Sequence, residues 1–240
     1  MANKYIELFD EDTEEKTFYD HLDRVYKERY QKKGVTKYLF DAGHEVLEKN
    51  IKKGSYYHIL EVGPGFAPHT PFILHKYQKI TYVEPNSKCN ELLNGTTPLK
   101  NDEQPIEIEI RNSAFPDSLL SSNTYDRVIA CHTIEHIPQP SLVIRDMYRV
   151  LKPGGVLSIT LPCDPGIIWR CAKTMGPGHQ FRKLGINYDY FSYKEHVNSI
   201  FSLQTFIKHL FKDHKMSVVW WPSRLPFADL NLFYICNIYK

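Results

Sequence analysis

Two glycines and two glutamates occur at a spacing that suits the binding of a nucleoside-like ligand. Gly63 and Gly65 close the apolar run that contains Glu61. Glycine has no Cβ, so a glycine turn after a strand lets the backbone approach a ligand closely. Glu84 ends the next apolar run, about twenty residues further on, which is the spacing at which a carboxylate binds ribose hydroxyls. The sequence therefore predicts a nucleoside-containing ligand beside the first two strands.

The glycine turn departs from the fingerprint of dinucleotide-binding proteins. That fingerprint requires a third glycine at position 68, where this chain has Pro68. A diphosphate at a helix N-terminus also needs free N–H groups, which Pro64 and Pro68 lack. An NAD-dependent oxidoreductase is thus disfavoured, and a cofactor without phosphates, such as S-adenosylmethionine, fits this turn better.

Several residues that exchange protons follow the apolar run at 125–131. His132, Glu135 and His136 come directly after it, and His196 lies further along the chain. Open α/β sheets bind ligands at the carboxyl ends of their strands, and a hydroxyl substrate needs a base to remove its proton. The candidate bases are His132, then His136, then His196. The alternative is that Glu135 and His136 are packing residues at the start of a helix.

These residues need a sheet to bring them together, and the chain alternates strand-like with helix-like segments. The expected strands are 57–62, 80–84, 106–110, 125–131 and 156–161, and the expected helices are 69–78, 87–94, 139–151 and 201–213. The early alternation predicts an α/β fold with a parallel, doubly wound sheet and right-handed crossovers. Two further runs, 216–221 and 230–238, predict an antiparallel pair that brings the sheet to seven strands.

Two regions lie outside this alternation. Helical spacing over 12–33 and 36–52 predicts an N-terminal helical extension, residues 1–54, that either caps the site or only packs beside it. Residues 162–200 are rich in Gly, Pro, Tyr and His and have little periodicity. We expect them to form an insertion over the carboxyl edge of the sheet, on the substrate side of a single domain spanning 1–240.

Composition excludes several classes of protein. The chain has 240 residues, a net charge of +2 and 42% apolar residues, which gives no basis for bulk nucleic-acid binding. No apolar run reaches the length of a membrane span, and the N-terminus does not resemble a signal peptide. Five cysteines without a CxxC pair indicate reduced thiols and a cytoplasmic protein. The scattered histidines give no metal-ligand spacing, so no metal is expected.

Five motifs follow one another in the order typical of class I S-adenosylmethionine-dependent methyltransferases, which the chain resembles over residues 55–165. They are Glu61-Val-Gly-Pro-Gly65, Glu84, Tyr125-Asp126, Ile134-Glu-His136 and Tyr148-Arg-Val-Leu-Lys-Pro-Gly-Gly155. The resemblance implies that Glu84 binds the ribose and that His132 lies beside the cofactor. It implies that Asn112 or Ser113 lies near the adenine, where the family often has an acidic residue. The residues it places at the methionine end are Glu61, Gly63, Pro64 and Gly65.

The substrate is predicted less closely. Asp164-Pro-Gly166 and Glu195-His-Val-Asn198 are similar to segments of methyltransferases from bacterial surface-polysaccharide pathways. This resemblance implies a small-molecule or carbohydrate acceptor, such as a sugar hydroxyl, a glycan or a phosphorylated, anionic precursor. The alternatives are an N-methyltransferase of a small amine and a catalytically inactive subunit that binds a partner.

Overall fold

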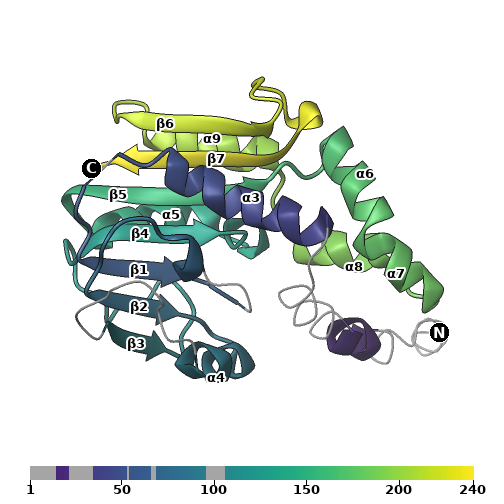
Figure 1. Ribbon diagram of the computed structural model, residues 1–240, viewed down its shortest axis with the longest axis horizontal. Coiled ribbons are helices and arrows are strands. Elements are labelled where there is room, and N and C mark those ends of the chain that lie inside the picture. The colour runs from purple at the N-terminus through teal and green to yellow at the C-terminus, as the bar shows by residue number, and fades with distance from the viewer. Residues whose placement is uncertain (1–14, 22–34, 53, 66–68, 96–105) are drawn as a thin grey trace, which may run out of the picture.

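A seven-stranded mixed sheet forms the centre of the molecule (Figure 1). The computed structural model describes residues 15–21, 35–52, 54–65, 69–95 and 106–240. The strand order is β3-β2-β1-β4-β5-β7-β6, parallel from β3 to β5, with β7 antiparallel to both of its neighbours. The predicted seven-stranded sheet and its antiparallel C-terminal pair are confirmed. The strands are β1 (His58–Val62), β2 (Lys79–Val83), β3 (Glu107–Arg111), β4 (Tyr125–Cys131), β5 (Leu151–Pro162), β6 (Met216–Pro222) and β7 (Asn231–Tyr239).

Apolar side chains of the strands form a core on each face of the sheet. In β4, Val128 and Ala130 face one core and Ile129 faces the other, as expected for successive residues of a strand. Helices α5 (Pro140–Val150) and α9 (Ile200–Leu210) cover the first face, and α3 (Val35–Lys49) packs on the other face against β7 and β5 (Figure 1). The short helix α4 (Ser87–Gly95) packs beside β3. Among the helices that the structure describes, none has the length and apolar character needed to cross a membrane.

The helix predicted over 69–78 is wrong. Only a 3-10 turn, η1 (Thr70–Phe72), forms there, with Pro71 inside it. The amide N–H of His69 is bound by the Glu61 carboxylate, and the N–H of Leu74 is bound by the Glu48 carboxylate. These two N–H groups are therefore hydrogen-bonded to side chains of β1 and α3. The hydrogen bonds hold the segment in an irregular conformation.

Residues Lys152 to Gly155, which lie between the helix predicted over 139–151 and the strand predicted over 156–161, are part of β5. Tyr125 pairs with Leu151 and Arg127 with Val156, so the intervening residues of β5 form a bulge. A Cβ at Gly155 would lie 2.8 Å from the carbonyl oxygen of Asp126. The strand therefore starts at Leu151, earlier than the predicted residue 156, and glycine is required where the bulge meets β4.

Residues 162–200 contain three short helices, which the sequence analysis did not predict. They are α6 (Ile167–Met175), α7 (Pro177–Lys183) and α8 (Tyr188–Glu195). Gly176-Pro177 separates the first two, and the side chain of Asn187 caps α8 by accepting the N–H of Tyr190. The three helices extend beyond the carboxyl ends of the parallel strands (Figure 1), which is the edge where we expected this segment to lie.

A helical segment at 15–21 packs against these helices. The ring of Phe18 stacks on Phe191 of α8, with centroids 4.5 Å apart, and lies 5.0 Å from Phe181 of α7. Lys194 of α8 forms an ion pair with Glu15 at 2.8 Å. The other residues of the helix predicted over 12–33 lie outside the described ranges, while the helix predicted over 36–52 is present as α3.

Candidate functional site

The glycine turn after β1 is held open by its backbone conformation. Gly63 has φ +61° and Gly65 has φ +54°, a region that favours glycine. A Cβ at Gly63 would lie 2.4 Å from Cγ2 of Thr133, whereas a Cβ at Gly65 would meet no atom of the described residues within 4 Å. Gly63 is therefore required for packing against the chain that follows β4. Gly65 faces open space where a ligand can approach the backbone, and Pro64 is buried between the two glycines.

Glu84 links the tip of β2 to this turn. One carboxylate oxygen accepts the N–H of Gly65 at 3.0 Å, and the other accepts the N–H of Asn86 at 2.8 Å. A carboxylate has about four lone-pair sites, so about two remain for further donors. A ribose has two vicinal hydroxyls, so it could donate one hydrogen bond to each of these sites.

Glu61 lies beneath the turn and is buried. Its carboxylate accepts the N–H of His69 at 2.6 Å, and the hydroxyl of Thr70 lies 3.4 Å from its second oxygen. Burial raises the pKa of Glu61 to about 7, although both hydrogen bonds act in the opposite direction. The group therefore changes charge close to neutral pH and would bind a cation more strongly in its ionised form.

The residues predicted beside the adenine occupy the end of β3. Asn112 is exposed, and the hydroxyl of Ser113 donates to the carboxylate of Asp117 at 3.0 Å. Asp117 also accepts from Arg111 at 3.2 Å and from the N–H of Leu119 at 2.9 Å. Ser113 is thus part of a network that orders this loop, and a role for either residue at the adenine stays a prediction.

His132 comes directly after β4 in an unusual conformation. Its φ of +54° lies in the left-handed region, where a residue with a Cβ is strained. The ring packs against Phe40 and Phe233 and is 18% exposed; this desolvation, together with the neighbouring His196 and His136, lowers the pKa of His132 to about 3. A base is most effective when its pKa is near the working pH, so this environment makes His132 a weaker candidate base than the sequence suggested.

A cavity lies between the end of β4, α3 and the helices of the insertion. Its walls are largely aromatic, with Phe40, Trp169, Tyr188 and Phe233, and its polar part contains His132, Glu135, His136, Lys173, Ser192 and His196. Three buried polar atoms of this lining have no hydrogen-bond partner among the described residues: Nε2 of His132, Oε2 of Glu135 and Nε1 of Trp169. Buried polar atoms are normally paired, so these three are available to a ligand.

Two histidines of the cavity are oriented by oxygens outside it. His196 Nδ1 lies 2.8 Å from the carboxylate of Asp164, and His136 Nδ1 lies 3.0 Å from the carbonyl oxygen of Glu195. The two rings are 4.8 Å apart between centroids. The side-chain amide of Asn198 donates to the carbonyl of Ile137 at 2.6 Å, which ties the segment after β4 to the segment after α8. The positions of the two imidazoles relative to one another are therefore fixed by the fold.

Glu135 lies beside these rings and is buried. Burial raises the pKa of Glu135 to about 7, while partial desolvation and the neighbouring His196 lower the pKa of His136, whose side chain is 38% exposed. One Glu135 oxygen is 3.9 Å from Nε2 of His136 and 3.9 Å from Nδ1 of His132. The cavity thus has one polar end at which a carboxylate and imidazoles converge.

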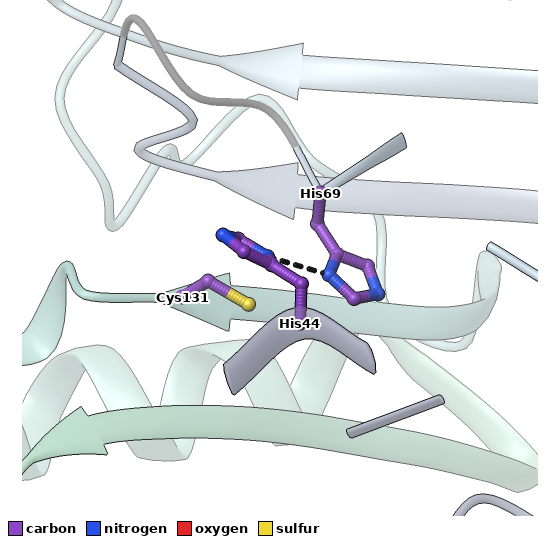
Figure 2. Close-up of side chains that lie close together, drawn as sticks. All are labelled: His44, His69 and Cys131. Carbon is purple, nitrogen blue, oxygen red and sulfur yellow. Dashed lines mark hydrogen bonds between the residues drawn. The ribbon is translucent and has the colours of Figure 1, made fainter. Parts of the chain in front are cut away.

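A second group of buried histidines lies between α3 and β4. Figure 2 shows the rings of His44 and His69 side by side, joined by a hydrogen bond between their Nδ1 atoms, which are 2.8 Å apart, with Cys131 near His44. Nε2 of His69 lies 2.7 Å from the carboxylate of Glu48, an acceptor, so this nitrogen carries hydrogen. Burial lowers the pKa of both histidines, so both are neutral and the Nδ1–H of His44 donates to Nδ1 of His69. This pair ties α3 to the segment after the glycine turn.

The structure brings together most of the predicted site. Glu61, Gly63, Gly65 and Glu84 lie at one turn, and His132, His136 and His196 line one cavity. Thr133 is a contributor that was not predicted. Asp164 and Trp169 lie in the segment expected on the substrate side, but the sequence assigned neither of them an individual role; the signal for Asp164 is that an acidic residue follows directly after the fifth parallel strand, at the edge where ligands bind.

Comparisons with known proteins agree with this arrangement. Residues 60–159 match a family model described as "Methyltransferase domain". The chain is 24% identical over 169 residues to sarcosine/dimethylglycine N-methyltransferase from Halorhodospira halochloris, covering 64% of this chain and 58% of that protein. It is 39% identical over 54 residues to ubiquinone biosynthesis O-methyltransferase from Pseudomonas syringae pv. syringae, covering 22% of this chain and 23% of that protein. The matched segments thus span less than two thirds of these relatives.

The fold is also found among solved structures. The plantazolicin methyltransferase BpumL, in complex with SAH, superposes with a TM-score of 0.62 at 11% identity and covers 95% of this chain and 93% of its own. At this identity the likeness concerns the fold, which is the seven-stranded methyltransferase sheet.

Proposed function

We propose that the chain is a class I S-adenosylmethionine-dependent methyltransferase that transfers a methyl group to a hydroxyl of a small molecule, an interpretation supported by the matched methyltransferase domain and by the relatives named above. The observation that carries the hydroxyl assignment is the polar end of the aromatic cavity, where oriented imidazoles and a buried carboxylate can accept a proton.

The residues at the glycine turn fit S-adenosylmethionine. Open space adjoins Gly65, and Glu84 keeps lone pairs for two ribose hydroxyls. Glu61 supplies a carboxylate for the amino group of the methionine end. When bound, this cofactor supplies an electrophilic methyl group on a sulfonium, so the protein mainly has to align the acceptor in line with that group.

Aromatic walls position the acceptor, and the polar end removes its proton. Phe40, Trp169 and Phe233 offer flat apolar faces to a ring, and Nε1–H of Trp169 is a free donor for a ring oxygen. His196, held by Asp164, presents its second nitrogen to the cavity and is better oriented for proton transfer than His132. The hydroxyl would lose its proton here as its oxygen attacks the methyl carbon.

These contacts favour a neutral acceptor such as a sugar or aromatic ring with a free hydroxyl. The resemblance to surface-polysaccharide methyltransferases also implied a phosphorylated, anionic acceptor, and residues 162–200 contain several basic side chains. Lys173 lines the cavity, but it lies 3.2 Å from the carboxylate of Asp189 and 4.0 Å above the ring of Tyr193. The charge of Lys173 is already balanced by Asp189, so this side chain would attract an anionic acceptor only weakly.

A small amine is the second candidate acceptor. The relative from Halorhodospira halochloris is named an N-methyltransferase, and the buried carboxylate of Glu135 together with the aromatic walls could hold an amine. An amine already has its lone pair when neutral and needs no oriented base, so the Asp164–His196 pair favours the hydroxyl.

Calorimetry with S-adenosylhomocysteine tests the cofactor part of the proposal. We expect binding by the parent protein and at least tenfold weaker binding by Glu84→Gln, because the amide loses charge-assisted hydrogen bonds worth about 1.5–3 kcal/mol. Glu91→Gln, at an exposed position of α4, is the matched control and should bind as the parent does. Equal binding by Glu84→Gln would show that the carboxylate does not hold the ligand.

Transfer of labelled methyl groups tests the acceptor. A panel of neutral sugars, phenols, sugar phosphates and small amines is incubated with labelled S-adenosylmethionine. O-methylated products from neutral compounds support the proposal. Labelling of amines alone would replace it with N-methylation, and labelling of sugar phosphates alone would remove the preference for a neutral acceptor.

A further inference from the structure

We propose that Glu135, His136 and His196 form a binding site for a divalent transition-metal ion at the polar end of the cavity. One ligand atom from each of these residues lies within 4.8 Å of the others. The inference rests on the proposed function for its role, since the ion would bind the acceptor oxygen, but the site itself follows from the three side chains.

The hydrogen bonds of both imidazoles leave the same nitrogen free. Nδ1 of His196 faces a carboxylate and Nδ1 of His136 faces a carbonyl, and these groups only accept hydrogen bonds. Each Nδ1 therefore carries hydrogen, and in the neutral ring Nε2 has the lone pair. Histidines that bind metals commonly donate their other N–H to a carboxylate or carbonyl in this way.

Glu135 supplies the negative charge. Its side chain is 2% exposed, and Oε2 has no hydrogen-bond partner among the described residues. The carboxylates of Asp164 and Glu195 stand behind the two imidazoles, at 2.8 Å from His196 and 3.8 Å from His136. The concentration of carboxylates around the two imidazoles favours a cation.

The geometry leaves room for an ion and for the substrate. Nitrogen and oxygen ligands around tetrahedral zinc are separated by roughly 3.4 Å, so the side chains need to close by small rotations from their present separation. Two histidines and one carboxylate form a three-ligand set, which leaves a fourth position open toward the cavity, as in catalytic zinc sites. With the ion bound, Nε2 of His196 would serve as a ligand and would no longer accept the proton; the ion would instead lower the pKa of the bound hydroxyl, which would lose its proton to water. The hydroxyl oxygen would then attack the methyl carbon, and the carbon–sulfur bond would break with its electron pair kept by sulfur.

The group formed by His44, His69 and Cys131 provides a contrast (Figure 2). There the two Nδ1 atoms are 2.8 Å apart and hydrogen-bonded to each other, which is closer than the roughly 3.4 Å between two ligands of a tetrahedral zinc ion. Nε2 of His69 is bound to Glu48. These nitrogens are bonded to each other or to a carboxylate, whereas His136 and His196 both line the cavity and Nε2 of His136 lies 3.9 Å from Oε1 of Glu135.

Metal binding is measured on untagged protein treated with EDTA and then dialysed. We expect calorimetry to show one equivalent of Zn²⁺ bound, and Co²⁺ to give visible absorption bands of a site with nitrogen and oxygen ligands. Glu135→Gln, which keeps the shape of the side chain, and His196→Ala should each weaken binding at least tenfold. His209→Ala, on the exposed side of α9, should bind as the parent does.

Three results separate the outcomes. Unchanged binding in Glu135→Gln and His196→Ala, or no binding by the parent, overturns the metal site. Loss of binding in Cys131→Ser places the ion at the other cluster and also overturns it. S-adenosylhomocysteine is titrated into each metal-free sample: binding of this ligand without any binding of metal removes only the inference, whereas failure of both removes the proposed function as well. Circular dichroism of each variant shows whether a loss reflects unfolding.

Discussion

Glu61 should make cofactor binding depend on pH. Its pKa is raised to about 7 by burial, so below that pH the folded protein holds a neutral carboxyl, and above it a carboxylate. The amino group of S-adenosylhomocysteine stays protonated in this range and pairs only with the ionised form. Affinity should therefore rise about tenfold per pH unit up to neutrality and become constant above it.

The measurement is calorimetric titration of S-adenosylhomocysteine at intervals from acidic to mildly alkaline pH. In Glu61→Gln the carboxyl is absent, so binding should be weaker and its slope below neutrality should disappear. A slope that persists in Glu61→Gln would assign the titration to another group.

At the scale of single residues, the sequence predicted the site residues that lie directly at the end of a strand. Gly63, Gly65 and Glu84 follow directly from the ends of β1 and β2, and the structure brings them into contact. The sequence could not show that Thr133 fills the space of a missing Cβ at Gly63, because that contact joins the ends of two different strands. It also could not rank the histidines, since the burial that disfavours His132 comes from Phe40 and Phe233, far away in the chain.

The helical segment at 15–21 and the helices α7 and α8 form one packed unit, and Phe18 is at its centre. Phe18→Ala removes a ring that is 1% exposed and contacts both helices, and such a change costs about 3–5 kcal/mol in a packed core. Because α8 leads into His196, we expect a several-fold higher KM for the acceptor and faster trypsin cleavage near this unit. Binding of S-adenosylhomocysteine at the other side of the site should be unchanged.

Phe206→Ala, at a half-exposed position of α9, is the matched control and should leave both measurements as in the parent. If Phe18→Ala behaves like this control, the N-terminal segment only covers the surface and does not support the acceptor site.

At the scale of elements, the regular alternation of strands and helices was predicted, and the segment that departs from it was not. Most strands were found close to their predicted bounds, and β5 begins earlier than predicted. Helices α6 to α8 were missed because residues 162–200 show little clear periodicity, and the helix over 69–78 failed because carboxylates of Glu61 and Glu48 bind backbone groups there. Such interactions depend on partners distant in sequence, so local patterns do not reveal them.

A buried ion pair connects α3 to the centre of the sheet. Arg127 of β4 is 0% exposed and lies 2.5 Å from the carboxylate of Glu48. It also donates to the hydroxyl of Ser158 at 3.0 Å. Arg127→Met leaves the Glu48 carboxylate buried without its counter-charge, so the free energy of unfolding should fall by about 3–5 kcal/mol in urea denaturation.

The double variant Arg127→Met/Glu48→Gln removes both charges and should recover part of the loss. If Arg127→Met alone is as stable as the parent, the pair does not hold α3 to the sheet. The sequence predicted both elements but not this link, because a charged residue inside an apolar strand has no recognisable partner until the fold is known.

One residue, Glu195, contacts two parts of the molecule at once. Its carboxylate accepts the hydroxyl of Tyr19, and its backbone carbonyl holds the imidazole of His136. Glu195 therefore connects the helical segment at 15–21 with the polar end of the cavity. Related enzymes that exchange this leading segment should differ in which compounds they modify while keeping the same methyl donor, so substrate range can diverge without any change in the sheet.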